Sequence, residues 1–415
     1  MSTDPYFQDL FADRIGGSKY GKGTEIYKFE KIKRAKRAAI ADFPNRPLLD
    51  FGIGENDEMA APEVRAALKS EVDRPENRGY ADNGILEYKE AVARFMQREF
   101  GVAVDPKTQV NHCIGSKTAL AILPAAFINP GDITLMTVPG YPVAGTHTKY
   151  YGGEVHRLPL VEENGFLPDL DTIPEAILER SKLLVLNYPN SPTGALATPA
   201  FFEKVVAFAR RHKLVVVNDA AHILLTLQGK PYSFLQTPGA MDVGVELHSM
   251  SKGFDMIGWR MGFVVGNELL VRAFADVKDN CDSGQFMAIQ KAAAVALDTP
   301  SIPAFVREKY RRRMEKLVQA LTAAGWQAKM PGGSYFLYVK APKANGSTSF
   351  ASAEDVSQFL IRERSICTVP WDDAGSFLRF SVTYRVEGEA EAAEAEEDRL
   401  MEELKSRLAQ DSFSW

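Results

Sequence analysis

The distribution of apolar residues predicts alternating strands and helices through the middle of the chain. Two short runs, residues 183–186 and 215–217, are apolar at every position, and segments with a helical spacing of apolar residues lie between such runs. Strands that are apolar on both sides are covered by helices on both faces, which is typical of a mostly parallel sheet. The pattern predicts helices over 86–100, 115–127 and 201–212, and strands over 133–138, 182–187 and 214–218.

The pattern changes near residue 300, where Pro300 and Pro303 interrupt the alternation. A long basic helix is predicted over 305–324, and short strands follow near 335–340 and 378–382. The chain is therefore expected to contain a second structural unit after this break.

These observations predict an α/β fold with a large and a small domain. Residues 48–299 are expected to form the large, mostly parallel-sheet domain, and residues 300–415 the smaller C-terminal domain. Residues 1–47, which are polar with an amphipathic piece over 27–40, are predicted to form an N-terminal arm and part of the small domain. The acidic, alanine-rich segment 387–408 is predicted to be a solvated helix.

Length and charge narrow the possible functions. At 415 residues the chain exceeds the usual size of a single hydrophobic core, which agrees with two domains. Its 49 basic and 54 acidic side chains are mixed along the sequence and give a net charge of −5, so neither nucleic acid nor membrane is an expected partner. Three widely spaced cysteines, together with the lack of a signal-peptide pattern and of a long apolar run, favour a reducing cytoplasm. A small molecule is the expected partner.

One short segment carries the most specific candidate chemistry. Lys252 stands close to Ser249 and Ser251, and Arg260 follows eight residues later. The lysine amine can form a Schiff base with pyridoxal phosphate, and the hydroxyls and the guanidinium can hold its phosphate. Because such a run is more often a solvated turn, the prediction of amino-group transfer depends on the rest of the sequence.

Three other segments supply further parts of such a site. Asp219 follows a predicted strand and can pair with a protonated pyridine nitrogen, although an aspartate there is commonly a turn former. A predicted helix begins near Ser116 and Lys117, and its N-terminus can either cradle a phosphate or simply be capped. Tyr141 offers an aromatic face on which a pyridine ring can stack.

Two more segments bear on ligand binding. The turn over 187–194 is rich in Asn and Pro and can contact the 3-oxygen of the cofactor, or serve only as a turn. Arg379 stands among apolar strand residues, so it requires an anion, which is either a substrate carboxylate or a structural partner. Functional groups in parallel α/β folds gather at the carboxyl ends of strands, which predicts that these segments meet.

Together these segments resemble the fold-type I pyridoxal-phosphate aminotransferases, over roughly residues 20–385. Four stretches are similar to the LL-diaminopimelate aminotransferases: residues 23–29 (GTEIYKF), 78–84 (RGYADNG), 279–286 (DNCDSGQF) and 369–375 (VPWDDAG). The resemblance implies pyridoxal 5'-phosphate as the cofactor and a homodimer with shared active sites. No metal is expected.

The resemblance also implies a role for each candidate residue. Lys252 is expected to carry the cofactor and move the proton, with Asp219 on the pyridine nitrogen and Tyr141 stacked on the ring. The other implied roles are phosphate binding by Ser116, Lys117, Ser249, Arg260 and, from the neighbouring subunit, Tyr80; α-carboxylate binding by Arg379; and lining of the substrate site by Tyr27 and Gly54.

Two positions depart from the family pattern. The family has Asn immediately before Pro-Thr-Gly and Tyr three residues after the aspartate, both contacting the cofactor 3-oxygen; this chain has Ser191 and His222. Asn190 reaches that oxygen only if the turn shifts. His222 either donates to it from one ring nitrogen, titrating near the unperturbed histidine pKa of about 6.5, or only packs at a strand end.

The implied reaction is ping-pong transamination between amino acids and 2-oxo acids. For the subgroup that the chain resembles, the substrates are LL-2,6-diaminopimelate with 2-oxoglutarate, giving tetrahydrodipicolinate and glutamate, in lysine biosynthesis. The alternatives are an aminotransferase for aromatic or other amino acids, a β-elimination lyase, and a non-catalytic cofactor-binding regulator. A nucleotide-dependent dehydrogenase is disfavoured, because residues 52–57 lack the third glycine of Gly-x-Gly-x-x-Gly.

Overall fold

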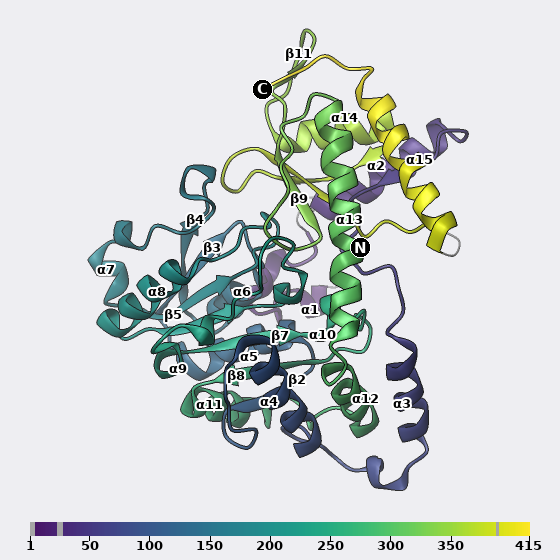
Figure 1. Cartoon of the computed structure of the whole chain (residues 1–415). Helices are drawn as coiled ribbons and strands as arrows, with labels where there is room; N and C mark the ends of the chain where they lie inside the picture. The colour runs from purple at the N-terminus through teal and green to yellow at the C-terminus, as the bar shows by residue number, and fades with distance from the viewer. Residues whose placement is uncertain (1–4, 23–27, 387–389) are drawn as a thin grey trace.

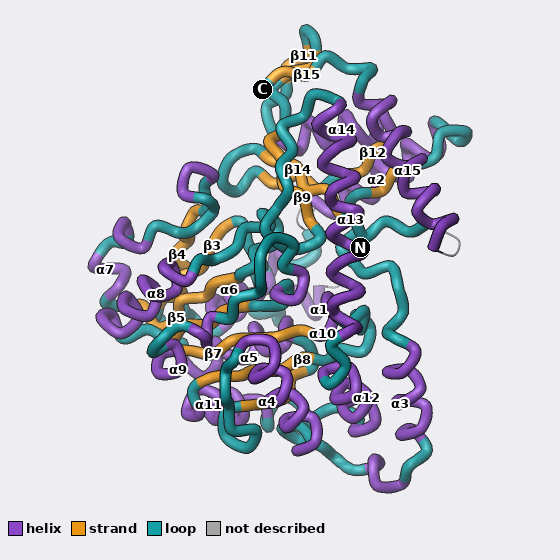
Figure 2. The backbone as a smooth tube through the Cα atoms, viewed as in Figure 1, coloured by secondary structure: helices purple, strands orange, loops and turns teal. Residues whose placement is uncertain are grey.

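A seven-stranded sheet forms the centre of the larger part of the computed structural model, which describes residues 5–22, 28–386 and 390–415 (Figure 2). Its strands are β2 (Val110–Cys113), β3 (Ile133–Val138), β4 (Glu154–Pro159), β5 (Ser181–Asn187), β6 (Val215–Asp219), β7 (Gly244–Ser249) and β8 (Gly262–Gly266). Their order is β2-β8-β7-β6-β5-β3-β4. All pairs from β4 to β7 are parallel, whereas β8 is antiparallel to both β7 and β2. The prediction of a mostly parallel sheet is confirmed.

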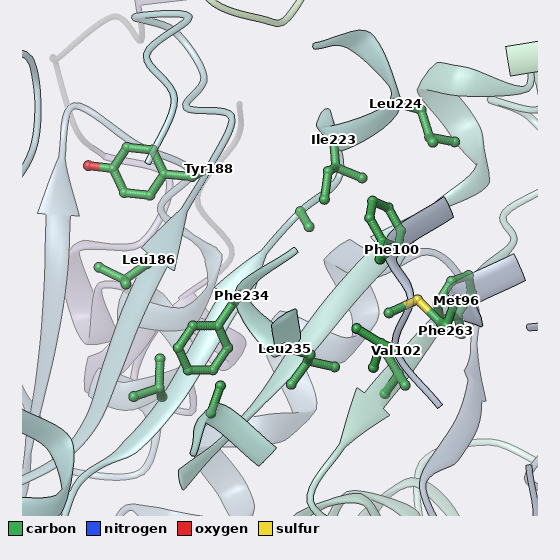
Figure 3. Close-up of a cluster of buried hydrophobic side chains, with 14 of the residues drawn as sticks. Met96, Phe100, Val102, Leu186, Tyr188, Ile223, Leu224, Phe234, Leu235 and Phe263 are labelled. Carbon is green, nitrogen blue, oxygen red and sulfur yellow. The ribbon is translucent and has the colours of Figure 1, made fainter. Parts of the chain in front are cut away.

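Both faces of this sheet are buried, which explains the uninterrupted apolar runs. Leu184 and Leu186 of β5 join a hydrophobic cluster on one face, and Leu183 and Val185 join a second cluster on the other, because successive side chains point to opposite sides. Figure 3 shows part of the first cluster, in which Leu186 lies in the same layer as aromatic side chains such as Phe234.

Helices contribute the other half of each cluster. The first cluster receives buried residues from α3 (Pro62–Val72), α4 (Leu86–Phe100), α8 (Pro199–His212), α9 (Ala240–Val243) and α12 (Met287–Leu297). The second receives them from α5 (Ser116–Phe127), α6 (Val143–Tyr150) and α11 (Glu268–Lys278). The short helices α1 (Pro5–Gln8), α7 (Glu175–Leu178) and α10 (Met250–Gly253) complete this part. The sheet is therefore the middle layer of three.

A smaller unit combines the N-terminal and C-terminal segments, at the top of Figure 1. Its strands are β1 (Leu49–Asp50), β9 (Phe336–Lys340), β10 (Ala344–Asn345), β11 (Thr348–Ser349), β12 (Ile366–Cys367), β13 (Val369–Trp371), β14 (Phe377–Ser381) and β15 (Phe413–Ser414). Its helices are α2 (Lys28–Asp42), α13 (Ser301–Ala323), α14 (Ala353–Arg364) and α15 (Ala390–Leu408). β1 pairs in parallel with β12, and β13-β14-β9 form an antiparallel sheet. The predicted smaller α/β unit is confirmed.

The long helix α13 extends from the larger unit into the smaller one (Figure 1). Its buried Arg313 forms ion pairs with Asp57, at 2.9 Å, and with Glu397 of α15, at 2.6 Å. A buried guanidinium requires such partners, so this pair of contacts connects α13, the loop after β1 and α15. The expectation of a wholly solvated helix over 387–408 is corrected, because Met401 and Leu404 of α15 are buried in the small hydrophobic core.

The predicted helices and strands agree closely with those observed, with small differences at their ends. α13 begins at Ser301, before the predicted residue 305, because a proline such as Pro303 is tolerated in the first turn of a helix, where its missing N–H has no partner to lose. In the large sheet, no residue range was predicted for β2, β4, β7 or β8. The domain boundaries near residues 48 and 300 stay a prediction, and β1 at residues 49–50 pairs within the small unit.

Candidate active site

A cavity of about 740 Å³ lies at the carboxyl ends of β5, β6 and β7, where the larger unit meets the smaller one. The predicted site residues that line it are Gly54, Ser116, Lys117, Tyr141, Ser191, Asp219, His222, Ser249, Lys252, Arg260 and Arg379. Asn190 and Tyr80 do not line it, and Tyr27 lies outside the described residues. The structure therefore brings most of the predicted residues together around one space.

Lys252 lies in the short helix α10, directly after β7. Its Nζ donates a hydrogen bond to the Gly54 carbonyl at 3.3 Å and lies 5.2 Å from the centre of the Tyr335 ring. Burial lowers the pKa of Lys252 to about 8, with Glu55 opposing this change and Arg260 adding to it. An amine with this pKa is neutral in part near pH 7.5, which a nucleophile or a general base requires.

Asp219 ends β6 and is 5% exposed. Its side chain accepts a hydrogen bond from the Ala221 N–H, and no described Lys, Arg or His lies within ion-pair distance of it. Burial raises the pKa of Asp219 to about 6, against the opposing effects of that N–H and of Lys252. A buried carboxylate at the cavity wall with no cationic partner fits the protonated ring nitrogen of a pyridine.

The N-terminus of α5 and Arg260 form one end of the cavity. Ser116 is the first residue of α5, and its preceding residue, Gly115, has a φ of +75°. A Cβ at Gly115 would lie 2.4 Å from Nη2 of Arg260, so only glycine leaves the guanidinium room beside the helix end. Arg260 also lies 3.4 Å from the Ser251 hydroxyl. A helix N-terminus, hydroxyls and a guanidinium form a cradle that fits a phosphate group.

Arg379 of β14 lies at the opposite side, in the smaller unit. It is 8% exposed; its Nη2 donates to the Gly52 carbonyl at 3.3 Å, and its guanidinium carbon lies 4.0 Å from the centre of the Phe336 ring. Burial lowers the pKa of Arg379 to about 10, and its Nε has no hydrogen-bond partner among the described residues. Arg379 lines the cavity, and a buried guanidinium at a cavity wall is suited to bind a carboxylate.

The turn after β5 is arranged differently from the expectation for Asn190. The Asn190 side-chain oxygen accepts from both N–H and hydroxyl of Thr193, so it stabilises the turn and does not reach the cavity. Asn187 lines the cavity instead, donating to the Asp219 carbonyl at 2.8 Å and accepting from the Ser191 N–H at 2.9 Å. Asn187 is the last residue of a predicted strand, and that position was the available signal for it.

His222 lies at the cavity wall with its ring fixed by neighbours. Its Nδ1 is 3.2 Å from the Ser334 hydroxyl, and its ring packs against Tyr335 and Phe336. Burial lowers the pKa of His222 to about 3, and the charges of Lys252 and Arg379 act in the same direction. The expectation of a titration near pH 6.5 is therefore corrected: desolvation keeps this imidazole neutral at working pH.

Some residues at the cavity rim are exposed in the single chain. Tyr141 is 43% exposed, and Lys117 is also exposed. Tyr80, expected to act in a neighbouring subunit, is 82% exposed. Exposed aromatic side chains of this size are typical of interfaces or ligand sites.

Several residues at or beside the cavity were not predicted. Asn56 donates to the Lys252 carbonyl at 2.7 Å and to the Asp255 carboxylate at 2.5 Å, so it connects the loop after β1 to the lysine turn. Lys28, Trp371 and Asp373 also line the cavity. The stretches that contain Lys28, Trp371 and Asp373 resemble the family in sequence, but only the fold brings these distant side chains to one cavity.

Two features are absent from the described residues. These residues contain no cluster of three or more His, Cys, Asp or Glu side chains placed to hold a metal ion. Among the same residues, no helix combines the length and apolar character that a membrane crossing requires.

The fold and the site together define a class. A mostly parallel sheet presents, at its carboxyl edge, an amine of lowered pKa between a phosphate-type cradle and a buried arginine, with a buried carboxylate beside them. That combination is the arrangement of an α/β amino-group transferase.

Comparisons with known proteins identify the family. Residues 46–395 match the family described as aminotransferase class I and II. The LL-diaminopimelate aminotransferase of Methanocaldococcus jannaschii is 56% identical over 98% of both chains, and that of Methanococcus maripaludis is 52% identical over 99% of both. A substrate-bound structure of BacF from Bacillus subtilis is 30% identical and superimposes with a TM-score of 0.83, covering 99% of this chain and 98% of that one. This chain belongs to the class I and II aminotransferases.

Proposed function

We propose that this chain is a pyridoxal-phosphate-dependent aminotransferase that converts LL-2,6-diaminopimelate and 2-oxoglutarate to tetrahydrodipicolinate and glutamate, a step of lysine biosynthesis. The observation that carries the proposal is the position of Lys252, in one cavity with the phosphate-type cradle on one side and Arg379 on the other. The names of the two archaeal relatives support the choice of substrate.

The residues around the cavity fit the cofactor. Ser116, Ser249 and Arg260, with the α5 N-terminus and the rim residue Lys117, are proposed to hold the phosphate. Asp219 is proposed to pair with the ring nitrogen, because its buried carboxylate otherwise lacks a cation. Other roles follow from position at the cavity: Tyr141 for ring stacking, and Asn187, Ser191 and neutral His222 for polar contacts to the ring.

Lys252 and Arg379 have different roles in the proposed reaction. When bound, pyridoxal phosphate supplies an electron sink for the charge that develops at the substrate α-carbon. Lys252 would carry the cofactor, and its Nζ, when free, would take the proton from the substrate α-carbon and deliver it to the cofactor carbon, which is the proton shift that transamination requires. The lowered pKa of Lys252, about 8, supports this role because the neutral amine is then available near pH 7.5. Arg379 binds the α-carboxylate, which fixes the reacting carbon relative to Nζ.

The proposal extends to assembly and location. We propose a homodimer with shared sites, as the resemblance to the family implies, and the 82% exposure of Tyr80 supports a role for this side chain in the neighbouring subunit. The three cysteines are free, two of them buried, which supports a reducing compartment such as the cytoplasm.

A donor panel tests the reaction and its rivals. With 2-oxoglutarate as acceptor, LL-diaminopimelate is expected to exceed alanine, aspartate and tyrosine in kcat/KM, because a site built for polar groups disfavours substrates that leave those groups unpaired. Equal kcat/KM for tyrosine or aspartate would contradict the substrate and leave the class intact. Pyruvate release without an acceptor would indicate the β-elimination lyase, and cofactor binding without any turnover would indicate a regulator.

A further inference from the structure

Lys28 and Asp373, two side chains of opposite charge, line the same cavity as Arg379. Lys28 is the first residue of α2, and Asp373 follows the end of β13. Because Val369 of β13 pairs with Arg379 of β14, the segment that leads to Asp373 runs beside the arginine. Lys28 and Asp373 therefore face the same space as Arg379, although they come from opposite ends of the chain.

Lys28 is held against the cavity wall. Its Nζ lies 3.6 Å from the centre of the Trp371 ring and 3.5 Å from the Pro370 carbonyl oxygen. Burial lowers the pKa of Lys28, Asp373 raises it and Arg379 lowers it further, so this ammonium lies within electrostatic reach of both side chains. Two neighbouring cations in one cavity favour a ligand with two anionic groups.

The two adjacent aspartates have different partners. The Asp372 carboxylate accepts from the Ala353 N–H at 2.8 Å and from the Glu354 N–H at 3.2 Å, so it caps α14. Asp373 lines the cavity and is exposed, and its carboxylate accepts no hydrogen bond from residues 5–22, 28–386 or 390–415. Asp372 therefore caps α14 and acts on Lys28 only through its charge, whereas Asp373 lines the cavity and is available to a ligand.

We propose that Lys28 and Asp373 form a subsite for the distal end of the substrate, in which Lys28 binds the distal carboxylate and Asp373 the distal ammonium. The inference rests on the proposed function, since LL-diaminopimelate is a diamino dicarboxylic acid with a second ammonium and carboxylate at its far end. Arg379 holds the reacting carboxylate, Lys28 the other, and the Trp371 ring limits the approach of water to that ammonium. The charge pattern of the cavity is then complementary to both ends of one molecule.

Three amino donors that differ only at the distal end test each contact separately. LL-diaminopimelate has both distal groups, L-2-aminopimelate lacks the distal ammonium, and L-lysine lacks the distal carboxylate. Asp373→Asn is expected to lower kcat/KM for LL-diaminopimelate by about 10- to 100-fold and to change that for 2-aminopimelate by less than about twofold. Lys28→Met is expected to lower kcat/KM for LL-diaminopimelate and 2-aminopimelate by a similar factor, with a change below about twofold for lysine.

Asp372→Asn is the matched control. It changes the neighbouring carboxylate in the same way but weakens the α14 cap, so it is expected to lower thermal stability and to affect all three donors equally. Where a donor reacts too slowly, its inhibition constant against LL-diaminopimelate provides the same comparison.

The outcomes separate this inference from the proposed function. A wild-type enzyme that uses LL-diaminopimelate no better than the other two donors overturns the proposed substrate. A wild-type preference for LL-diaminopimelate, combined with equal losses for all three donors in Asp373→Asn and Lys28→Met, overturns the subsite alone. An effect of Asp373→Asn that survives removal of the distal ammonium would show that Asp373 acts on the fold or on Lys28.

Discussion

Replacing Arg379 with lysine keeps the positive charge but removes the fork of the guanidinium. Arg379 lines the cavity, is 8% exposed and packs on the Phe336 ring at 4.0 Å. A lysine ammonium cannot form two parallel hydrogen bonds to a carboxylate, so one charge-assisted bond is lost in a desolvated site. Such a bond contributes about 1.5–3 kcal/mol, which corresponds to a fall of about 10- to 150-fold in kcat/KM.

Steady-state kinetics with both an amino acid and a 2-oxo acid measure this loss. The decrease is expected for both substrates, because each presents an α-carboxylate to the same guanidinium. Arg272→Lys, an exposed change on α11, is the control and is expected to alter kcat/KM by less than about twofold. Unchanged kcat/KM for both substrates in Arg379→Lys, with the fold intact, would refute the reasoning and assign Arg379 to the fold.

Three further predictions test the cofactor side of the cavity. Asp219→Asn is expected to reduce turnover and to raise the free energy of unfolding of the cofactor-free protein at pH 7.5 by about 3 kcal/mol, because burial raises the pKa of Asp219 from 3.8 to about 6. In chemical denaturation, the free energy of unfolding of the wild type should fall by about this amount as the pH rises from about 4 to 6. A variant that is no more stable than the wild type at pH 7.5 would contradict this prediction. Gly115→Ala is expected to weaken cofactor binding at least about tenfold in an absorbance titration, because the added Cβ would meet Arg260. Gly101→Ala is the control, since Gly101 has a similar φ of +67° but open space around it, and it should leave cofactor binding unchanged. Equal effects of both changes on cofactor binding would argue against the phosphate cradle. Because the pKa of His222 is about 3, its ring stays neutral between pH 5 and 8, and the pH titrations of cofactor absorbance of the wild type and His222→Gln should have the same transitions over this range. A transition near pH 6.5 that is present in the wild type and missing in the variant would show that His222 titrates.

The sequence was informative wherever one local pattern determined the structure. Alternate burial of Leu183–Leu186 on both sheet faces made β5 predictable, and strand-end positions made Asp219 and Lys252 predictable as neighbours. The role proposed for Arg379 required the additional argument that a buried arginine needs an anion.

The remaining site features depend on tertiary contacts. Asn190 and Asn187 lie in one polar turn, and the hydrogen bonds to Thr193 decide which of them faces the cavity. The neutral state of His222 follows from burial, which the sequence does not reveal. Lys28 and Asp373 are separated by most of the chain, so only the pairing of the terminal segments in the small unit brings them together.

The most direct test of the central claim is glutamate formation from LL-diaminopimelate and 2-oxoglutarate over many turnovers, measured for the wild type, Lys252→Ala and Lys252→Arg. The wild type is expected to turn over. Both variants are expected to fold and retain the cofactor at the cradle, yet form no glutamate, because neither offers an amine that can carry the cofactor and move the proton. Sustained glutamate formation by Lys252→Ala would contradict the assignment of Lys252 and the mechanism built on it.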